Sequence, residues 1–394
     1  MGIELDVQGL DDHRNFSPGD AVAGSVLLKL DCSTVISAIA ARLEGWVSTS
    51  LVEKGSPFVL GNDVPTVAEE SHQLFAISEI VFPPPDIPQL SREYTLPKAE
   101  YRFPFKITFP RALNSSGLQL PPSFNAHSVK HRATAEIKYA LTIELTRPGR
   151  LRKCISIQRQ LQFRPSEPDS SLLPSMRPVS QIGQAALYID SSANHVADPG
   201  IPVLILEGVL PCPPVVRPGM KLPLSLRIRH LPVHLEHSIP IKMRSLILTL
   251  RGTTTITAGT HHASWVCSEK LLSLDAMNQD CSCIPGVESF TGIDAGLLDN
   301  LVVPSGASSF RCSIVEQKYS LGVEAGFAVG VASKLRAIGF VINLEIWSGI
   351  CTDVGEDPLV LVDGRSRIPE LFDGFVEGAG AETLPCYSSG LSFS

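Results

Sequence analysis

In FSPGDAVAGSVLLKL, residues 16–30, an aromatic residue and a Pro-Gly pair precede apolar residues at every second position. A close copy, VRPGMKLPLSLRIRH, occupies residues 216–230. Proline fixes φ and the glycine after it tolerates unusual backbone angles, so each Pro-Gly pair predicts a turn that leads into a strand. The chain therefore repeats one structural unit about half its length apart.

Two further matches keep the same order along the chain. They are ARLEGWVSTS (residues 41–50) with LTLRGTTTIT (residues 248–257), and EIKYALTIEL (residues 136–145) with EQKYSLGVEA (residues 316–325). The first match aligns Gly45 with Gly252, and the second aligns Tyr139 with Tyr319. Because loop length drifts faster than strand pattern, similar but unequal offsets are typical of a duplicated β-sandwich.

Alternation of apolar and polar residues is the main secondary-structure signal, and long helical periodicity is scarce. Such alternation indicates strands with one buried face, so we expect an all-β chain of two tandem immunoglobulin-like β-sandwiches. The inward rows are Phe103, Phe105, Ile107 and Phe109; Ile137, Tyr139, Leu141, Ile143 and Leu145; Leu222, Leu224, Leu226 and Ile228; and Ile338, Phe340, Ile342, Leu344 and Ile346.

The length of 394 residues also favours two domains, because single cores rarely grow that large. The predicted parts are a sandwich at 1–165, a linker at 166–199, a second sandwich at 200–363 and a flexible acidic tail at 364–394. Long insertions near 52–100 and 258–310 are expected to be loops with functional roles or no fixed structure.

Composition excludes some classes of function. The net charge of −7 argues against a general nucleic-acid binder, which would carry a basic excess. Nine scattered cysteines and a start, MGIELDVQGL, without a secretory signal predict a reducing, cytoplasmic location. The apolar segment 325–342 carries Lys334 and Arg336, each costly inside a bilayer, so we expect strand, loop and strand there.

Three stretches in order resemble the N-terminal domain of arrestins. They are FSPGDAVAGSVLLKL, YRFPFKITFPRALNSSGLQLPPSF (residues 101–124) and AEIKYALTIELTRPGRLRKCISIQRQLQF (residues 135–163). The resemblance covers most of residues 10–165, and the second half joins it only through the internal copy. The chain length and the C-terminal LPCY are similar to those of the arrestin-related proteins of fungi, the alpha-arrestins.

This resemblance implies two linked immunoglobulin-like sandwiches, no catalytic site and no cofactor. It implies a cytoplasmic adaptor that binds the cytoplasmic tails of membrane transporters or receptors. Such adaptors recruit WW-domain ubiquitin ligases through Pro-Tyr motifs and link their clients to the endocytic machinery. The resemblance also allows recruitment to the plasma membrane or endosomes by peripheral membrane association.

The first candidate site is LPCY, with Leu384, Pro385 and Tyr387. WW domains stack a short polyproline-type segment in an aromatic groove, and the family form is Pro-Pro-x-Tyr. Leu384 departs from that form. The segment is interpreted as a ligase-recruiting motif, and the alternative is an ordinary tail that contains a proline and a tyrosine.

The second candidate is a basic turn, RPGRLRK, that contains Arg147, Arg150, Arg152 and Lys153. Residues 126–165 hold nine basic and two acidic side chains, whereas residues 351–394 hold two basic and eight acidic ones. Guanidinium groups bind phosphates and carboxylates, so the turn could bind an anionic partner for which the acidic tail competes. A solvated turn is the alternative.

Arg159 falls on the inward row of ISIQRQLQF, where a buried cation would need a carboxylate. Arrestins keep a charged cluster between their domains as a switch, but we expect a β-bulge here that turns Arg159 outward. In the tail, LVLVD at 359–363 fits either a loose clathrin-box pattern or a final strand. A further tail segment has apolar residues at helical spacing that could dock on a sandwich or a partner: Ile368, Leu371, Phe372 and Phe375.

Metal and nucleophile motifs are weak. The residues His261, His262, Cys281 and Cys283 do not complete a tetrahedral set at the usual spacing, and no phosphate-binding loop or nucleophile elbow is present in the sequence. We therefore expect no metal and no enzymatic activity. Two alternatives stay open: a vesicle-sorting scaffold that acts without a ubiquitin ligase, and a metal-dependent enzyme that uses residues 258–310.

Overall fold

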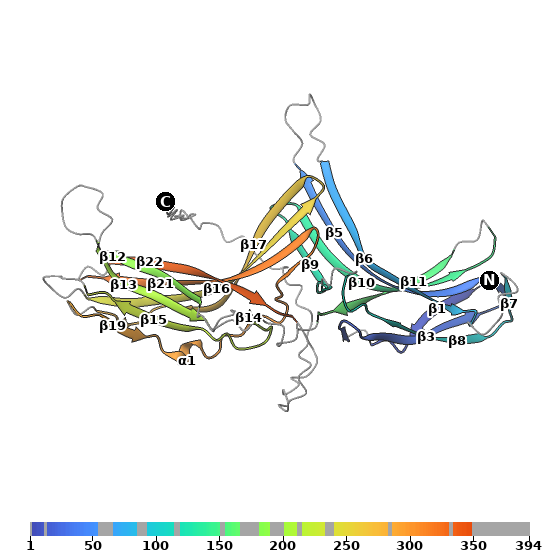
Figure 1. Ribbon diagram of the computed structural model, residues 1–394, viewed down its shortest axis with the longest axis horizontal. Helices are drawn as coiled ribbons and strands as arrows, with labels where there is room; N and C mark the ends of the chain where they lie inside the picture. Colours follow the sequence, from blue (N-terminus) through green and yellow to red (C-terminus); the bar gives the residue numbers. More distant parts are fainter. Residues whose placement is uncertain are drawn as a thin grey trace, which may run out of the picture. The chain divides into compact units, whose positions relative to one another are not determined.

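The first half of the chain forms a β-sandwich (Figure 1). One layer has the order β1-β3-β8 and the other the order β2-β11-β10-β5-β6, with β9 paired to β10 and the small sheet β4-β7 beside them. The strands are β1 (Ile3–Gln8), β2 (Asn15–Phe16), β3 (Ala21–Leu30), β4 (Thr34–Ile36), β5 (Ala38–Glu53), β6 (Thr66–Phe82), β7 (Tyr94–Leu96), β8 (Glu100–Thr108), β9 (Phe124–Ser128), β10 (Ala133–Thr146) and β11 (Ile155–Phe163).

The second half forms another sandwich, with layers β12-β13-β15-β19 and β14-β22-β21-β16-β17. Strand β18 pairs with β16, and β20 pairs with β21. The elements are β12 (Gln181–Ile189), β13 (Ile201–Leu210), β14 (Val215–Val216), β15 (Ser225–His230), β16 (Ile241–Ala258), β17 (His261–Leu274), β18 (Gln279–Asp280), β19 (Ser289–Gly292), the short helix α1 (Ala295–Leu298), β20 (Phe310–Arg311), β21 (Val315–Val329) and β22 (Lys334–Ile346).

These elements come from a computed structural model, and all described residues fall within the unit 1–352. The described ranges are 2–11, 14–53, 66–84, 93–113, 119–149, 154–165, 181–189, 201–210, 215–232, 240–282, 286–330 and 334–348. The basic residues Arg150, Arg152 and Lys153 and every tail residue named above lie outside these ranges. Within them, α1 is the only α-helix, so the predicted all-β fold of two sandwiches is confirmed.

The buried rows follow the alternation seen in the sequence. On β10 the side chains of Ile137, Tyr139, Leu141, Ile143 and Leu145 are buried, and the residues between them are more exposed except Ala140. In each sandwich the inward side chains of the two facing sheets form a core cluster. Burial of these side chains stabilises the fold because it removes apolar area from water.

The two Pro-Gly turns have the same construction. Gly19 and Gly219 both have positive φ, +86° and +77°, which glycine adopts without steric cost. The Gly19 N–H donates to the carbonyl of Phe109 at 3.1 Å, and the Gly219 N–H donates to that of Val303 at 2.7 Å. The sequence repeat therefore corresponds to the same backbone hydrogen bond in both sandwiches.

The aligned glycines and tyrosines face each other across neighbouring strands. Gly45 on β5 lies opposite Tyr139 on β10, and Gly252 on β16 lies opposite Tyr319 on β21. A Cβ atom would lie 2.8 Å from the ring of Tyr139 at position 45, and 3.0 Å from that of Tyr319 at position 252. Glycine at both positions therefore makes room for the tyrosine ring.

Two expectations about connections need correction. The predicted linker 166–199 contains β12, which pairs with β13 and so begins the second sandwich at Gln181. The insertions near 52–100 and 258–310 are not long loops, since they supply β6 and β17, strands of 17 and 14 residues. Their mixed composition suits edge strands, which are buried on fewer sides and so show weaker alternation.

The apolar segment 325–342 is strand, turn and strand as expected, because β21 ends at Val329 and β22 begins at Lys334. In the described part of the chain, no helix has the length and apolar character needed to span a membrane.

Candidate functional site

Three long strands of the second sandwich connect it to the first. The ends of β16, β17 and β21 reach past their own sandwich and pack into the core cluster of the first. The second-sandwich side chains buried there are Ile256, Ala258, Trp265, Ile314 and Val315. Beside them, the rings of Phe124 and Phe310 meet edge to face, with centroids 4.8 Å apart. The contact between the sandwiches is therefore largely apolar.

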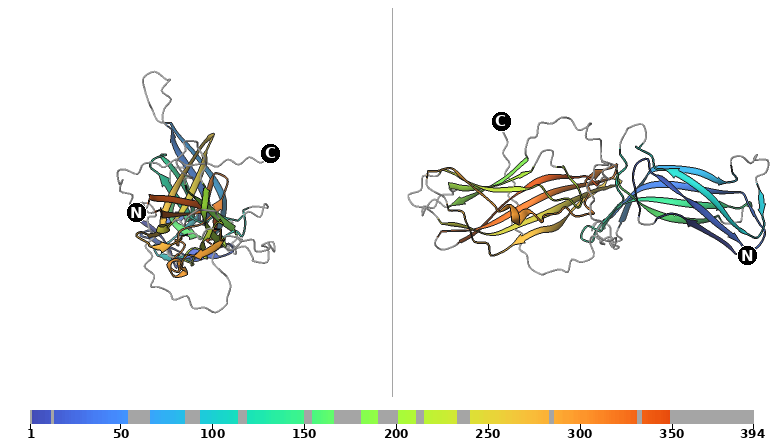
Figure 2. Two further views of the ribbon diagram at one scale, coloured as in Figure 1. Left: turned by 90° about the vertical axis from the view of Figure 1, so that its left-hand side faces the viewer. Right: turned by 90° about the horizontal axis from the view of Figure 1, so that it is seen from below.

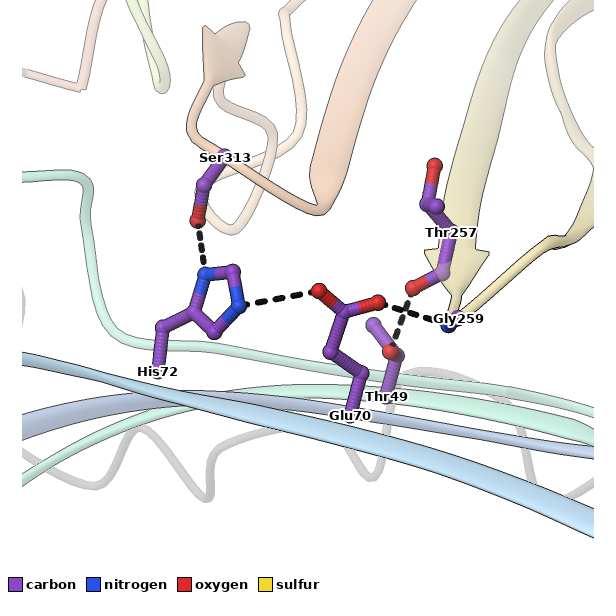
Figure 3. Close-up of polar contacts among 6 residues, drawn as sticks. All are labelled: Thr49, Glu70, His72, Thr257, Gly259 and Ser313. Atoms are coloured by element: carbon purple, nitrogen blue, oxygen red, sulfur yellow. Dashed lines mark hydrogen bonds and ion pairs between the residues drawn. The ribbon is translucent and has the colours of Figure 1, made fainter.

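A group of polar contacts lies at this junction (Figure 3). The Gly259 N–H, in the turn between β16 and β17, donates to Glu70 Oε2 at 2.7 Å. The other carboxylate oxygen, Oε1, lies 2.9 Å from His72 Nε2. The Thr49 hydroxyl donates to the carbonyl of Thr257 at 2.6 Å. One carboxylate thus holds both a turn of the second sandwich and a histidine of its own strand.

His72 carries the contact on to the second sandwich, because its Nδ1 lies 2.9 Å from the Ser313 hydroxyl. The neutral imidazole satisfies both neighbours when Nε2 donates to Glu70 and Nδ1 accepts from Ser313. The protonated ring satisfies them as well, since the serine hydroxyl can turn to accept. We name Thr49, Glu70, His72, Thr257, Gly259 and Ser313 the junction cluster.

A polar pocket of about 320 Å³ lies next to the junction cluster on β5, β6 and β10. Its lining consists of hydroxyl and carboxylate groups, from Ser48, Thr49, Ser50, Glu69, Glu70, Ser71 and Thr134. The pocket offers hydrogen bonds and negative charge.

The β-bulge expected at Arg159 is absent from the described strand β11, so that prediction is wrong. Strands β10 and β11 pair in register from Tyr139↔Leu161 to Leu145↔Ile155, without a shift. Arg159 therefore stays on the row of Ile157 and Leu161, and its Nη2 lies 3.3 Å from Asp6 Oδ1 on β1. Both side chains of this ion pair are about two-fifths exposed, so water solvates the charges and no buried cation results.

Only one residue of the predicted basic turn can be placed. Arg147 is half-buried just after the end of β10, and its three predicted companions lie outside the described residues. Leu384, Pro385 and Tyr387 also lie outside them, as do 359–363 and the apolar tail residues from Ile368 to Phe375. The anion-binding and WW-domain predictions therefore stay predictions.

The weak metal candidates are dispersed. His262 accepts or donates a hydrogen bond with the Thr257 hydroxyl at 3.0 Å, whereas Cys281 is buried in the core of the second sandwich. Cys283 lies outside the described residues. Among the residues with described positions, no three His, Cys, Asp or Glu side chains gather as metal ligands would.

Cysteines near the junction are poor nucleophiles. Burial raises the pKa of the Cys267 thiol, and burial also raises that of Cys312. A raised thiol pKa leaves little thiolate, which is the reactive form of cysteine. These side chains pack against the first core, so their position is explained by apolar contact.

Sequence reasoning did not find the junction cluster. Glu70 and His72 lie in a segment that was expected to be an insertion, and Ser313 carries no motif. A usable signal was the run TTTIT at residues 253–257, because β-branched residues extend β16 beyond the length that one sandwich needs.

Residues 2–163 match the family model of the arrestin (or S-antigen) N-terminal domain. This range spans the whole first sandwich, from β1 to β11. A search of curated proteins finds no match to the chain.

Proposed function

We propose that this protein is a non-enzymatic cytoplasmic adaptor that links the tails of membrane transporters or receptors to a ubiquitin ligase and the endocytic machinery. One observation carries the proposal: the first sandwich matches an arrestin domain, and the second repeats its turn and its Gly–Tyr pair. Arrestin-family proteins act as scaffolds without catalysis.

An adaptor of this kind needs surfaces rather than an active-site cleft. Among the described residues, β6 and β17 are the last strands of their sheets and pair along one side only. Exposed strand edges can pair with an extended partner peptide. The packing at the junction cluster keeps both sandwiches together, so that one chain can hold a client and a ligase at once.

The ligase connection rests on Leu384, Pro385 and Tyr387. The test is a binding assay between purified WW domains and the full chain, compared with Tyr387→Ala. We expect Tyr387→Ala to weaken binding at least tenfold, because the tyrosine fills the specificity pocket of a WW domain. Phe393→Ala is the matched control, an aromatic residue of the same tail, and it should bind like the unchanged chain. Equal affinities for Tyr387→Ala and the control would reject ligase recruitment through this motif.

Client recognition is assigned to the basic turn with Arg147, Arg150, Arg152 and Lys153. A truncation after residue 363 removes most of the acidic tail and should tighten binding of a phosphorylated peptide. Electrostatic competition predicts that this gain shrinks in high salt. An unchanged affinity at low salt would reject competition by the tail.

Two measurements separate the proposal from its alternatives. If the chain binds client tails and Tyr387→Ala leaves its recruitment of the ligase unchanged, the vesicle-sorting scaffold is favoured. A metal bound at a fixed ratio to protein, and lost in Cys281→Ala, would indicate a metal-dependent enzyme.

A further inference from the structure

The sheet β12-β13-β15-β19 is one layer of the second sandwich (Figure 2), and several large apolar side chains lie exposed on its outer face, where water would favour polar ones. The exposed fractions of Ile182, Phe290 and Tyr188 are 54%, 56% and 44%. Ile205 and Val209 lie between them on β13, half-buried. The opposite, inner row is buried in the second core, through residues such as Leu204, Leu206 and Leu226.

An antiparallel sheet with one solvated face normally alternates apolar and polar residues. This sheet has apolar side chains on both faces, and on the outer face the pairing register puts them in two rows on either side of the polar row Gln184, Glu207 and Arg227. Ile182 lies opposite Val209, and Phe290 lies opposite Arg229, which in turn lies opposite Ile205. Exposed apolar side chains gathered on one face together with charged groups mark surfaces that bind another molecule.

The charged part of this face is a carboxylate between two arginines. Arg227 Nε donates to Glu207 Oε2 at 2.7 Å, and Arg229 Nε lies 3.3 Å from Oε1 as an ion pair. The guanidinium of Arg227 also lies over the Phe290 ring, 5.0 Å from its centroid. The Glu207 side chain is only 5% exposed, whereas those of Arg227 and Arg229 are 45% and 32% exposed.

Among the described residues, the ion pairs of Arg227 and Arg229 share the single carboxylate of Glu207, so one positive charge is left over between the two apolar rows. The arginines keep their terminal amino groups for further hydrogen bonds, because each contact to Glu207 uses Nε. A second carboxylate would complete the pairing, and Arg–carboxylate contacts are among the strong, directional ones. A partner that balances this charge must therefore bring a carboxylate, and the side chains next to that carboxylate would contact an apolar surface.

We propose that this face, defined by Ile182, Tyr188, Ile205, Val209, Arg227, Arg229 and Phe290, docks a partner protein through a segment that presents one carboxylate among large apolar side chains. The four strands are spaced so that the face is about 14 Å wide, which matches two to three turns of a helix. The apolar side chains of the segment bury Ile182, Tyr188 and Phe290, and its carboxylate binds Arg227 and Arg229. This surface is independent of the ligase motif and of the basic turn.

The test uses a library of displayed random 12-residue peptides, selected on the full chain and counter-selected on the double variant Ile182→Ser, Phe290→Ser. We expect the recovered peptides to carry an acidic residue next to Leu, Phe or Trp. Recovery of no peptide that distinguishes the two proteins, or of peptides without acidic residues, would overturn the proposal.

The affinity of the most enriched peptide then separates docking from a structural role. Arg227→Gln and Arg229→Gln should each weaken binding about tenfold, since each removes a charge-assisted hydrogen bond. Glu207→Gln should strengthen binding, because it removes the carboxylate that competes for both arginines. Weakening by Glu207→Gln equal to that of the arginine variants would contradict the proposal.

Controls keep the result interpretable. Val341→Ser on β22 removes a similarly exposed apolar side chain, and Arg102→Gln on β8 removes an exposed arginine, and neither should change binding. Phe290→Ser alone changes an exposed edge-strand side chain, so it tests the apolar contact if Glu207→Gln fails to fold. Concentration-dependent dimerisation that Phe290→Ser abolishes would show that a second copy occupies the face, and would overturn the partner-protein assignment.

Discussion

Phe16, Phe109 and Phe163 of the first sandwich have Val216, Val303 and Ile346 as their counterparts in the second. Phe16 pairs in parallel with Phe163, and Val216 pairs in parallel with Ile346. Phe109 and Val303 accept the hydrogen bonds of the two Pro-Gly turns. The same backbone positions therefore hold aromatic rings in one sandwich and aliphatic side chains in the other.

The same contrast surrounds the two tyrosines. Tyr139 is fully buried, and its ring lies within 4.7–6.0 Å of those of Phe163, Phe109 and Phe75. Tyr319 is half-buried beside the side chain of Gln317, which accepts from the Thr254 hydroxyl at 2.6 Å. Burial is also the main cause of the raised pKa of both phenols, with a larger rise for Tyr139.

The difference shows which features of a sandwich can change freely. A turn that needs positive φ and a strand that must admit a tyrosine ring both require glycine, so these positions are the same in the two sandwiches. Core positions need only apolar volume that packs well, and rings can be exchanged for aliphatic chains when neighbours adjust.

Substitution of the two tyrosines should give the largest difference in stability. Tyr139→Ala should lower the free energy of unfolding by about 3–5 kcal/mol, because it leaves a cavity within an aromatic cluster and an unsatisfied Pro121 carbonyl. Tyr319→Ala should cost about 2 kcal/mol, since solvent already reaches its side chain. Denaturant unfolding followed by circular dichroism measures both. Equal losses would mean that the two rings are equivalent.

The glycines opposite the tyrosines test the same contrast with a smaller change. Gly45→Ala should destabilise by about 1–3 kcal/mol, because the new methyl group meets the rings of Tyr139 and Phe75 at 2.8 and 2.9 Å. Gly252→Ala should cost less, since its nearest neighbour is the end of the Gln317 side chain. Thermal unfolding gives the values, with Gly292→Ala, which meets nothing within 4 Å, as control. A larger loss for Gly252→Ala than for Gly45→Ala would refute this reasoning.

The junction cluster should contribute less than either core. Glu70→Ala removes the acceptor for Gly259 and should cost about 1–2 kcal/mol. Glu70→Gln keeps an oxygen for the Gly259 N–H and loses the charge beside His72, so the cost should be about half. The same unfolding assay applies, and identical losses for the two variants would assign the effect to the charge alone.

The smallest effect is a pH dependence that belongs to the second sandwich. His230 is 2% exposed, and its burial lowers the pKa of the imidazole, opposed by the negative charge of Asp280. The unfolded chain therefore binds more protons than the folded one, and stability should fall as the pH drops from about 7 through the folded-state pKa. His230→Gln should flatten this acid loss, whereas His131→Gln, at an exposed position, should not. An unchanged slope in His230→Gln would exclude His230 as the source.

The sequence predicted those features of the fold that depend on local patterns. The alternation on β10 and β22 and the two Pro-Gly turns are visible because side-chain period and backbone angle are local properties. The edge strands β6 and β17 were missed because an edge faces water on more sides and carries mixed residues. The start of β12 was missed because its inner row contains small residues, Gly183 and Ala185.

The candidate site was less predictable because it depends on contacts across long sequence distances. Glu70 meets Gly259 across 189 positions, and Arg159 meets Asp6 across 153. A bulge at Arg159 was inferred from the cost of burying a cation, but the structure leaves that side chain partly in water and keeps the register. No residue-level motif reports such pairings.

The strand ends of the second sandwich form part of the first core, so we expect the two repeats to unfold as one body. Hydrogen exchange of the β10 amides in Ile256→Ala tests it most directly. We expect at least tenfold faster exchange on β10, because the lost side chain belongs to the first core. Leu226→Ala, inside the second core alone, should leave β10 exchange much less affected. Faster exchange in Ile256→Ala that is confined to β16 and β21, with β10 unchanged, would contradict the claim.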